Sequence, residues 1–199
     1  MTARLWFLDV DGVIAPFGKG GAFTDWVRSP HPEYELWLSP TQADLIRRIL
    51  ERTGTELVWV TTWAQDASTY IEGVLGWRTH RFAPLPHSDI RGADLDPATG
   101  RWWKLDAVQR FLEELQPDRF VWSDDDLDQH RSAVRQALTG LGSIGLLQSP
   151  RPHVGLTRTL LREAEEHLDA GHVEASGAGP SGPRRPDGRQ GREGGQADV

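Results

Sequence analysis

The chain has 199 residues, of which 38% are hydrophobic, and its 29 acidic and 22 basic residues give a net charge of −7. It contains no cysteine, which excludes disulfides, thiol catalysis and cysteine-based zinc sites. The acidic balance argues against a protein that holds nucleic acid by neutralising phosphates alone. No long apolar span and no apolar leader occur, so the sequence predicts a cytoplasmic protein without a membrane partner.

The first predicted element is an apolar strand that begins at Leu5 and runs into Asp9 and Asp11. An unbroken apolar run predicts a strand that is buried on both faces. Residues two apart in an extended chain point to the same side, so the two carboxylates are expected to converge. Gly12 would then allow a sharp exit from the strand. The alternative is an Asp-Gly turn that closes an ordinary strand.

The remaining segments alternate between helices and strands. Residues 15–38 are predicted to be irregular, and the glycine-rich loop around Lys19 lacks the spacing of a P-loop. Helices are expected at about 39–54, 65–75, 102–115, 129–138 and 156–168, and strands at 56–61, 119–123 and 143–147, with a further short strand within 77–83. This order predicts an α/β fold with a parallel sheet and right-handed crossovers.

The chain is expected to divide into a folded part and a tail. Residues 171–199 are rich in glycine and arginine and contain no aromatic residue. Such a segment buries too little apolar surface to offset its conformational entropy. We therefore expect one folded domain over residues 1–170 and a disordered tail over residues 171–199.

Polar residues follow successive predicted strands. The carboxyl ends of parallel strands lie at one edge of a sheet, which is where sites form in α/β proteins. Clustered carboxylates raise one another's pKa values unless a cation lies among them, and oxygen ligands at this density favour Mg²⁺. A carboxylate can also accept a phosphoryl group whose oxygens are met by a metal, a lysine and hydroxyl donors. The residues concerned are Asp9, Asp11, Thr61, Lys104, Asp124 and Asp125.

Lys104 stands out because only two of the 22 basic residues are lysines. It falls in the first turn of a predicted helix, where a positive charge opposes the helix dipole. Lysine offers a compact point charge where arginine offers a broad fork. A functional role is therefore favoured over a solvated helix lysine.

With these residues in view, the chain resembles the haloacid dehalogenase (HAD) superfamily. The run from Asp9 to Ile14, DVDGVI, is similar to motif I, and Thr61 at the end of an apolar strand resembles motif II, with Thr62 as the competing assignment. Lys104 resembles the motif III base, and the run from Ser123 to Asp128, SDDDLD, resembles motif IV. More narrowly, the segments VWVTTW and WWK resemble small HAD-like domains associated with RNA-repair proteins.

The resemblance implies a role for each matching residue. Asp9 would be the nucleophile, and Asp11 would act as general acid and then as general base. Thr61 would hydrogen-bond the phosphoryl oxygens, Lys104 would neutralise charge, and Gly12 and Thr62 would contact the substrate. Mg²⁺ would be held by Asp9, by the backbone carbonyl of Asp11, by Asp124 and by Asp125. Asp126 is expected to be a helix N-terminal acid, and Asp128 a supporting hydrogen-bond acceptor.

The segments where a HAD cap would be inserted, residues 15–38 and 76–101, are too short for a full cap. The resemblance therefore implies a capless, Rossmann-like three-layer sandwich that acts as a Mg²⁺-dependent phosphatase on small or large phosphorylated substrates. The alternatives are a polynucleotide-end phosphatase in RNA repair and a binding or scaffold module with little turnover. Trp6, Trp59 and Trp122 are predicted core residues, Trp63, Trp102 and Trp103 are candidates for base stacking, and His80, His87 and His130 are predicted to lie at the surface or in loops.

Overall fold

The computed structural model describes residues 3–18, 21–87 and 95–170. Its centre is a five-stranded sheet in the order β5-β4-β1-β6-β7, in which every neighbouring pair is parallel. This arrangement confirms the predicted α/β fold. The strands are β1 (Arg4–Leu8), β4 (Glu56–Trp59), β5 (Arg81–Phe82), β6 (Arg119–Ser123) and β7 (Ile144–Gln148), and a separate antiparallel ribbon is formed by β2 (Val27–Arg28) and β3 (Trp37–Leu38).

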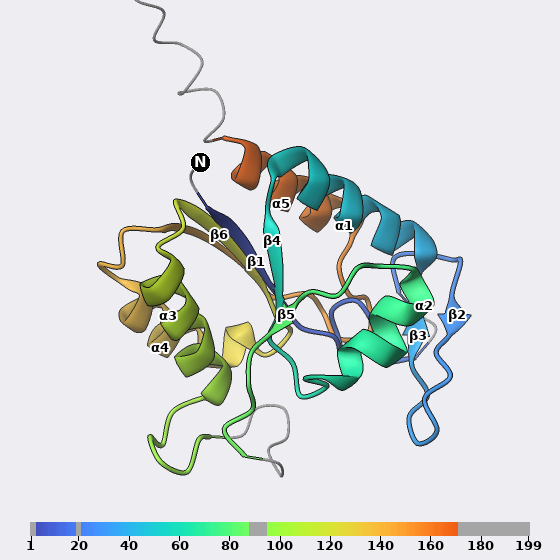
Figure 1. Cartoon of the computed structure of the whole chain (residues 1–199), viewed down its shortest axis with the longest axis horizontal. Helices are drawn as coiled ribbons and strands as arrows, with labels where there is room; N and C mark the ends of the chain where they lie inside the picture. The colour runs from blue at the N-terminus through green and yellow to red at the C-terminus, as the bar shows by residue number, and fades with distance from the viewer. Residues whose placement is uncertain (1–2, 19–20, 88–94, 171–199) are drawn as a thin grey trace, which may run out of the picture.

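Helices cover both faces of the sheet, which gives the three layers expected from the sequence (Figure 1). α1 (Pro40–Thr53) and α5 (Arg158–Asp169) pack together on one face, and α3 (Trp103–Leu115) and α4 (Leu127–Leu138) pack together on the other. Among the described residues, no helix has the length and apolar character needed to cross a membrane.

The alternation of side chains along β1 explains the two cores. Trp6 and Leu8 lie in the core under α1 and α5, whereas Leu5 and Phe7 lie in the core under α3 and α4. All five residues of β1 are buried, as expected for a central strand of a parallel sheet. The predicted core tryptophans Trp6, Trp59 and Trp122 are at most 1% exposed, which confirms that part of the sequence analysis.

α1 is delimited by the residues that the sequence indicated. The Ser39 side chain accepts a hydrogen bond from the backbone N–H of Gln42, Pro40 occupies the first turn, and Gly54 ends the helix in the left-handed conformation.

Two predicted elements differ in part from the structure. Residues 15–38 are not wholly irregular, because the β2–β3 ribbon forms within them. The predicted helix over 65–75 is helical from residue 66 to residue 75, but its middle is a π-helical turn, η1 (Ser68–Glu72), which is followed by the short α2 (Gly73–Leu75). His80 lies in the loop before β5, as one of the two predicted alternatives had it, and its side chain is buried against the Glu72 carboxylate, 2.9 Å away.

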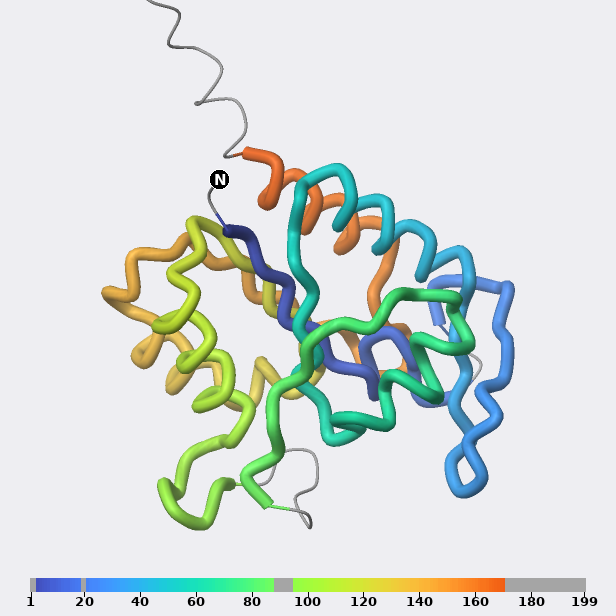
Figure 2. The backbone as a smooth tube through the Cα atoms, viewed as in Figure 1, coloured from blue at the N-terminus to red at the C-terminus, as the bar shows by residue number. Residues whose placement is uncertain are grey.

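The described residues contain no large cap. The first segment where a cap would be inserted holds the β2–β3 ribbon, and the described part of residues 76–101 holds only β5 and turns (Figure 2). Among the described residues, neither segment forms a separate cap domain. Lys19 and the predicted disordered tail at 171–199 lie outside the described residues.

Candidate active site

The three central strands end level with one another. Leu8 of β1 pairs with Trp59 of β4 and with Ser123 of β6, which are the last residues of those strands. Beyond the ends, the Asp9 N–H donates to the Ser123 carbonyl at 3.1 Å and the Asp124 N–H donates to the Gln148 carbonyl at 3.0 Å. The residues that follow β1 and β6 are thus fixed side by side by the sheet register.

The chain turns immediately after β1, which corrects the prediction that the strand extends through Asp11. The Val10 carbonyl accepts hydrogen bonds from the N–H groups of Val13, Ile14 and Ala15 at 3.0–3.2 Å. Gly12 takes a φ of +67°, which a side chain disfavours. The sheet register therefore places Asp9, whereas the tight turn, and not the alternation of an extended strand, places Asp11.

Lys104 joins the two strand ends through ion pairs. Its Nζ lies 2.6 Å from Asp9 Oδ2 and 2.8 Å from Asp124 Oδ2, and all three side chains are buried. The lysine sits in the first turn of α3, which brings it across the carboxyl edge of the sheet. The helix position that looked unfavourable in the sequence is compensated by two buried carboxylates.

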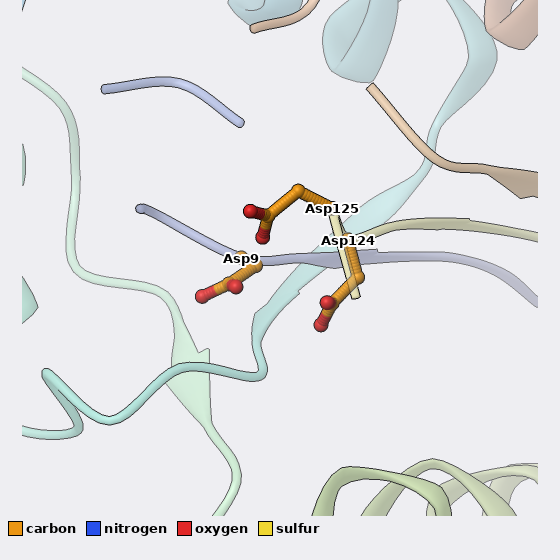
Figure 3. A group of neighbouring side chains, drawn as sticks. All are labelled: Asp9, Asp124 and Asp125. Atoms are coloured by element: carbon orange, nitrogen blue, oxygen red, sulfur yellow. The ribbon is translucent and has the colours of Figure 1, made fainter. Parts of the chain in front are cut away.

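Asp125 completes a group of three carboxylates. One oxygen from each of Asp9, Asp124 and Asp125 lies within 4.8 Å of the others, and Figure 3 shows the three side chains at the ends of β1 and β6. Asp125 packs directly against Gly12, since a Cβ at that position would lie 2.3 Å from Asp125 Oδ2. The glycine of the predicted motif is therefore required for the close approach of an acid.

The electrostatics of this group favour a bound cation. Burial, together with the charge of Asp9, raises the pKa of Asp125 to about 7. Burial also raises the pKa of Asp124 above its ordinary value, although Lys104 opposes that change. Burial disfavours the Lys104 ammonium, but the charges of Asp124 and Asp9 outweigh this effect and raise its pKa. One lysine thus faces several buried carboxylates.

Asp11 lies beside the group and has its own partner. Its Oδ2 accepts a hydrogen bond from Trp63 Nε1 at 2.9 Å. Burial and the charge of Asp9 raise the pKa of Asp11 to about 6, and the Trp63 hydrogen bond works against that rise. This contact was not predicted from the sequence, where the one signal for it is the tryptophan two residues after Thr61.

Thr61 and Thr62 differ in their surroundings. Thr61 is 1% exposed and its Oγ1 accepts the N–H of Trp63 at 3.4 Å, whereas Thr62 is half-buried. The preceding residue, Val60, donates its N–H to the Leu8 carbonyl at 2.9 Å, so both threonines follow the carboxyl end of β4. β4 itself ends at Trp59, two residues earlier than predicted.

A polar network that the sequence analysis missed supports the end of β6. Ser123 Oγ donates to Gln148 Oε1 at 2.9 Å and accepts from Trp6 Nε1 at 3.0 Å. Gln148 Nε2 in turn donates to the Leu160 carbonyl at 2.8 Å. The signal in the sequence was a glutamine at the end of an apolar strand.

Several other residues that the sequence singled out lie away from the three carboxylates or are buried by neighbouring side chains. Trp102 and Trp103 are each 2% exposed, so they are core residues, and of the three candidates for base stacking only Trp63 remains. His130 is half-buried and its ring stacks on Trp102 with centroids 4.2 Å apart. Asp126 accepts from Gln129 Nε2 at the start of α4, and Asp128 pairs at the surface with Arg131.

The donor set fits a magnesium ion. It consists of carboxylate oxygens, which suit Mg²⁺ better than softer metals that prefer nitrogen or sulfur. Three buried or half-buried acids also need positive charge beyond what Lys104 supplies. Asp9, Asp124 and Asp125 are the side chains that could hold the ion.

A comparison with protein families agrees with this geometry. Residues 5–149 match the model of the HAD domain in Swiss Army Knife RNA repair proteins. The chain belongs to this family. The match covers every residue of the candidate site, and it confirms the family and the Rossmann-like fold. No curated protein sequence matched the chain.

Gly12 offers a direct test of the local geometry of this HAD domain. We expect Gly12→Ala to lower the free energy of unfolding by about 1–2 kcal/mol through backbone strain, and to weaken Mg²⁺ binding because the new methyl group displaces Asp125. Urea unfolding and calorimetric Mg²⁺ titration measure the two effects.

Gly54→Ala is the matched control for Gly12→Ala. Gly54 has a similar φ of +64°, but no atom lies within 4 Å of a Cβ built there. Gly54→Ala should therefore lower the free energy of unfolding through backbone strain without weakening Mg²⁺ binding. Equal Mg²⁺ affinity in both variants would contradict a role for Asp125 in holding the ion.

Proposed function

We propose that this HAD domain is a Mg²⁺-dependent phosphomonoester hydrolase that passes through a phosphoryl-Asp9 intermediate. The observation that supports this most strongly is the pair of contacts from Lys104 Nζ, 2.6 Å to Asp9 and 2.8 Å to Asp124. A lysine held in this position orients the Asp9 carboxylate and places positive charge where a phosphoryl group would arrive. A bound Mg²⁺ would add positive charge against the phosphoryl oxygens.

The proposed reaction has two steps that use the same residues. Asp9 attacks phosphorus, the bond from phosphorus to the ester oxygen breaks, and that oxygen takes the proton of Asp11. Asp11 then removes a proton from water, which attacks phosphorus and breaks the bond to Asp9. Inorganic phosphate is released and the Asp9 carboxylate is regenerated. The raised pKa of Asp11, about 6, suits a group that must give and take a proton near neutrality.

Thr61 and Lys104 complete the proposed machinery. The buried Thr61 hydroxyl is the better placed of the two threonines to donate to a phosphoryl oxygen, and Thr62 and Gly12 would line the substrate side. In the family, the domain occurs in RNA repair proteins, which makes a phosphorylated RNA end the favoured substrate over a small metabolite. The described segments also leave the carboxyl edge without a large cap, so a large substrate could approach it.

The test of this function is phosphate release from p-nitrophenyl phosphate, and from 5′- and 3′-phosphorylated RNA, with and without Mg²⁺. A rapid acid quench followed by peptide mass spectrometry should find one phosphoryl group on the peptide that contains Asp9. Turnover without Mg²⁺, or a phosphoryl group on another residue, would overturn the mechanism. Absence of turnover together with no binding of Mg²⁺ and beryllofluoride would favour a binding module.

The role of Asp11 predicts an effect that depends on the leaving group. Asp11→Asn removes the proton that an alkoxide needs, so hydrolysis of an alkyl phosphate should fall on the order of 10²-fold. Hydrolysis of p-nitrophenyl phosphate should fall much less in its first step, because its leaving group needs no proton. Burst kinetics separate that step from hydrolysis of the intermediate. An equal loss of the first step on both substrates would contradict the assignment.

A further inference from the structure

Four aromatic rings gather beside the candidate site and have no role in the chemistry described above. The His31 ring lies 4.4 Å from Tyr70, 4.9 Å from Tyr34 and 5.1 Å from Trp63, measured between ring centroids. Tyr34 and Trp63 are themselves 5.8 Å apart. We call these four residues the aromatic cluster. His31 and Tyr34 come from the loop between β2 and β3, Trp63 from the loop after β4, and Tyr70 from η1.

Hydrogen bonds fix the cluster to the rest of the domain. Ser29 Oγ donates to the Tyr70 carbonyl at 2.7 Å, which ties the β2–β3 ribbon to η1. His31 Nδ1 lies 3.1 Å from the N–H groups of both Glu33 and Tyr34 and accepts from them, so that nitrogen carries no proton. The hydrogen bonds therefore hold the loop that carries His31 and Tyr34 in a defined position relative to η1.

The aromatic cluster is directly connected to Asp11. Trp63 donates its indole N–H to Asp11 Oδ2 at 2.9 Å, so the edge of one ring touches the proposed general acid. The group that departs from the phosphate must have its ester oxygen beside Asp11. The rest of a bulky leaving group can therefore lie against the aromatic cluster.

The cluster is open to a ligand, unlike the other aromatic groups near the site. Tyr34 is 59% exposed, the highest value among the exposed large hydrophobic residues of the described chain, and Trp63 is half-buried. Trp102 and Trp103, by contrast, are 2% exposed. A tyrosine this exposed adds little to the core, whereas its face can stack on a planar ligand.

We propose that the aromatic cluster receives the base of the terminal nucleotide of a phosphorylated, single-stranded RNA end. The proposal rests on the proposed function, because it treats the terminal nucleoside as the leaving group, which departs from phosphorus and takes its proton from Asp11. Stacking on aromatic side chains is tolerant of sequence, since every base has a π-face. It also suits an acidic chain with a net charge of −7, which cannot rely on neutralising many phosphates.

Binding of short RNAs tests the proposal. The probes are fluorescent RNA hexanucleotides with a 5′- or a 3′-terminal phosphate, each made with a normal or an abasic terminal nucleotide, and polarisation is measured in Mg²⁺. The Asp9→Asn background prevents turnover during the measurement. Loss of the terminal base should weaken binding by at least about fivefold for the end that the site accepts. The affinity should depend only weakly on salt.

Variants of Tyr34 identify the surface that reads the base. In the same background, Tyr34→Ala should abolish the difference between normal and abasic probes, and Tyr34→Phe should keep it. Ile144→Ala is the control and should leave the difference intact. Ile144 is 54% exposed and begins β7, the edge strand on the side of the sheet opposite β4 and β5. Equal binding of normal and abasic probes, or a difference that survives Tyr34→Ala, would overturn the proposal.

The experiments distinguish an error in the proposed role of the aromatic cluster from an error in the proposed function. If the wild-type protein hydrolyses phosphorylated RNA but the terminal base does not affect binding, only the role of the cluster falls. If binding depends on the base and on Tyr34 but the wild-type protein releases no phosphate, the cluster stands as a base-binding site and the phosphatase mechanism falls.

Discussion

Asp9→Asn is expected to reduce the rate of phosphate release by at least about 10⁴-fold, because the amide cannot form the phosphoryl intermediate. Asparagine has nearly the same shape, and Lys104 keeps its contact of 2.8 Å with Asp124. The fold should therefore persist, which circular dichroism and the unfolding midpoint can verify. The measurement is release of inorganic phosphate at saturating Mg²⁺ and substrate.

Asp128→Asn is the matched control for Asp9→Asn. Asp128 is also an aspartate of the predicted motifs, but its side chain is 62% exposed and pairs with Arg131 on α4. Its replacement should leave the rate nearly unchanged. If Asp9→Asn retained turnover, the nucleophile would have to be another group or a water molecule, and the phosphoryl-Asp9 mechanism would be abandoned.

The grouping of Asp9 with Asp124 was predictable because it depends only on topology. Apolar runs that alternate with helices predict a parallel sheet, and the residues after its strands must meet at one edge. The sequence could not show where β1 ends. The strand stops at Leu8 because its partners β4 and β6 also stop there, at Trp59 and Ser123, so the ladder cannot continue to Asp11.

The aromatic residues show the limits of sequence reasoning more clearly. Trp102 and Trp103 precede Lys104 in the sequence, but the packing of α3 against the sheet buries both. Trp63 is different because the loop after β4 turns its indole N–H toward Asp11. Contacts between segments far apart in the chain decide whether a tryptophan next to a motif belongs to the core or to the site. Periodicity within one segment does not contain that information.

Lys104→Met is expected to have the second large effect, on stability as well as on activity. The substitution keeps an unbranched side chain but leaves Asp9 and Asp124 buried without their shared partner. Removing one member of a buried ion pair costs about 3–5 kcal/mol. We expect a loss of this size in the free energy of unfolding near pH 7.5 without Mg²⁺, measured by urea denaturation. Phosphate release should fall on the order of 10³-fold, as for loss of a charged donor at the reacting group.

Arg47→Met is the matched control for Lys104→Met. It removes an exposed cation of α1 that pairs with Asp44 and Glu51, and it should lower the free energy of unfolding far less than Lys104→Met does. A similar small loss in Lys104→Met would mean that the buried ion pairs contribute little to the fold.

The stability loss in Lys104→Met should depend on pH in a definite direction. Without the lysine, burial and the charge of Asp9 raise the folded-state pKa of Asp124 above its value in the unfolded chain. A carboxyl group with a raised folded-state pKa destabilises the fold above its unfolded pKa, and the penalty grows until the pH passes the folded pKa. The difference from wild type should therefore shrink as the pH is lowered from 7.5 toward 5, where the Asp124 carboxyl becomes protonated.

Added Mg²⁺ provides the decisive comparison for Lys104→Met. A cation among Asp9, Asp124 and Asp125 would neutralise the charge that the lysine no longer balances, so Mg²⁺ should stabilise the variant more than the wild type. The increase in unfolding free energy follows the ratio of the Mg²⁺ concentration to its dissociation constant. If Mg²⁺ stabilised neither protein, these three carboxylates would not form a metal site, and Lys104 would serve only to neutralise two buried acids.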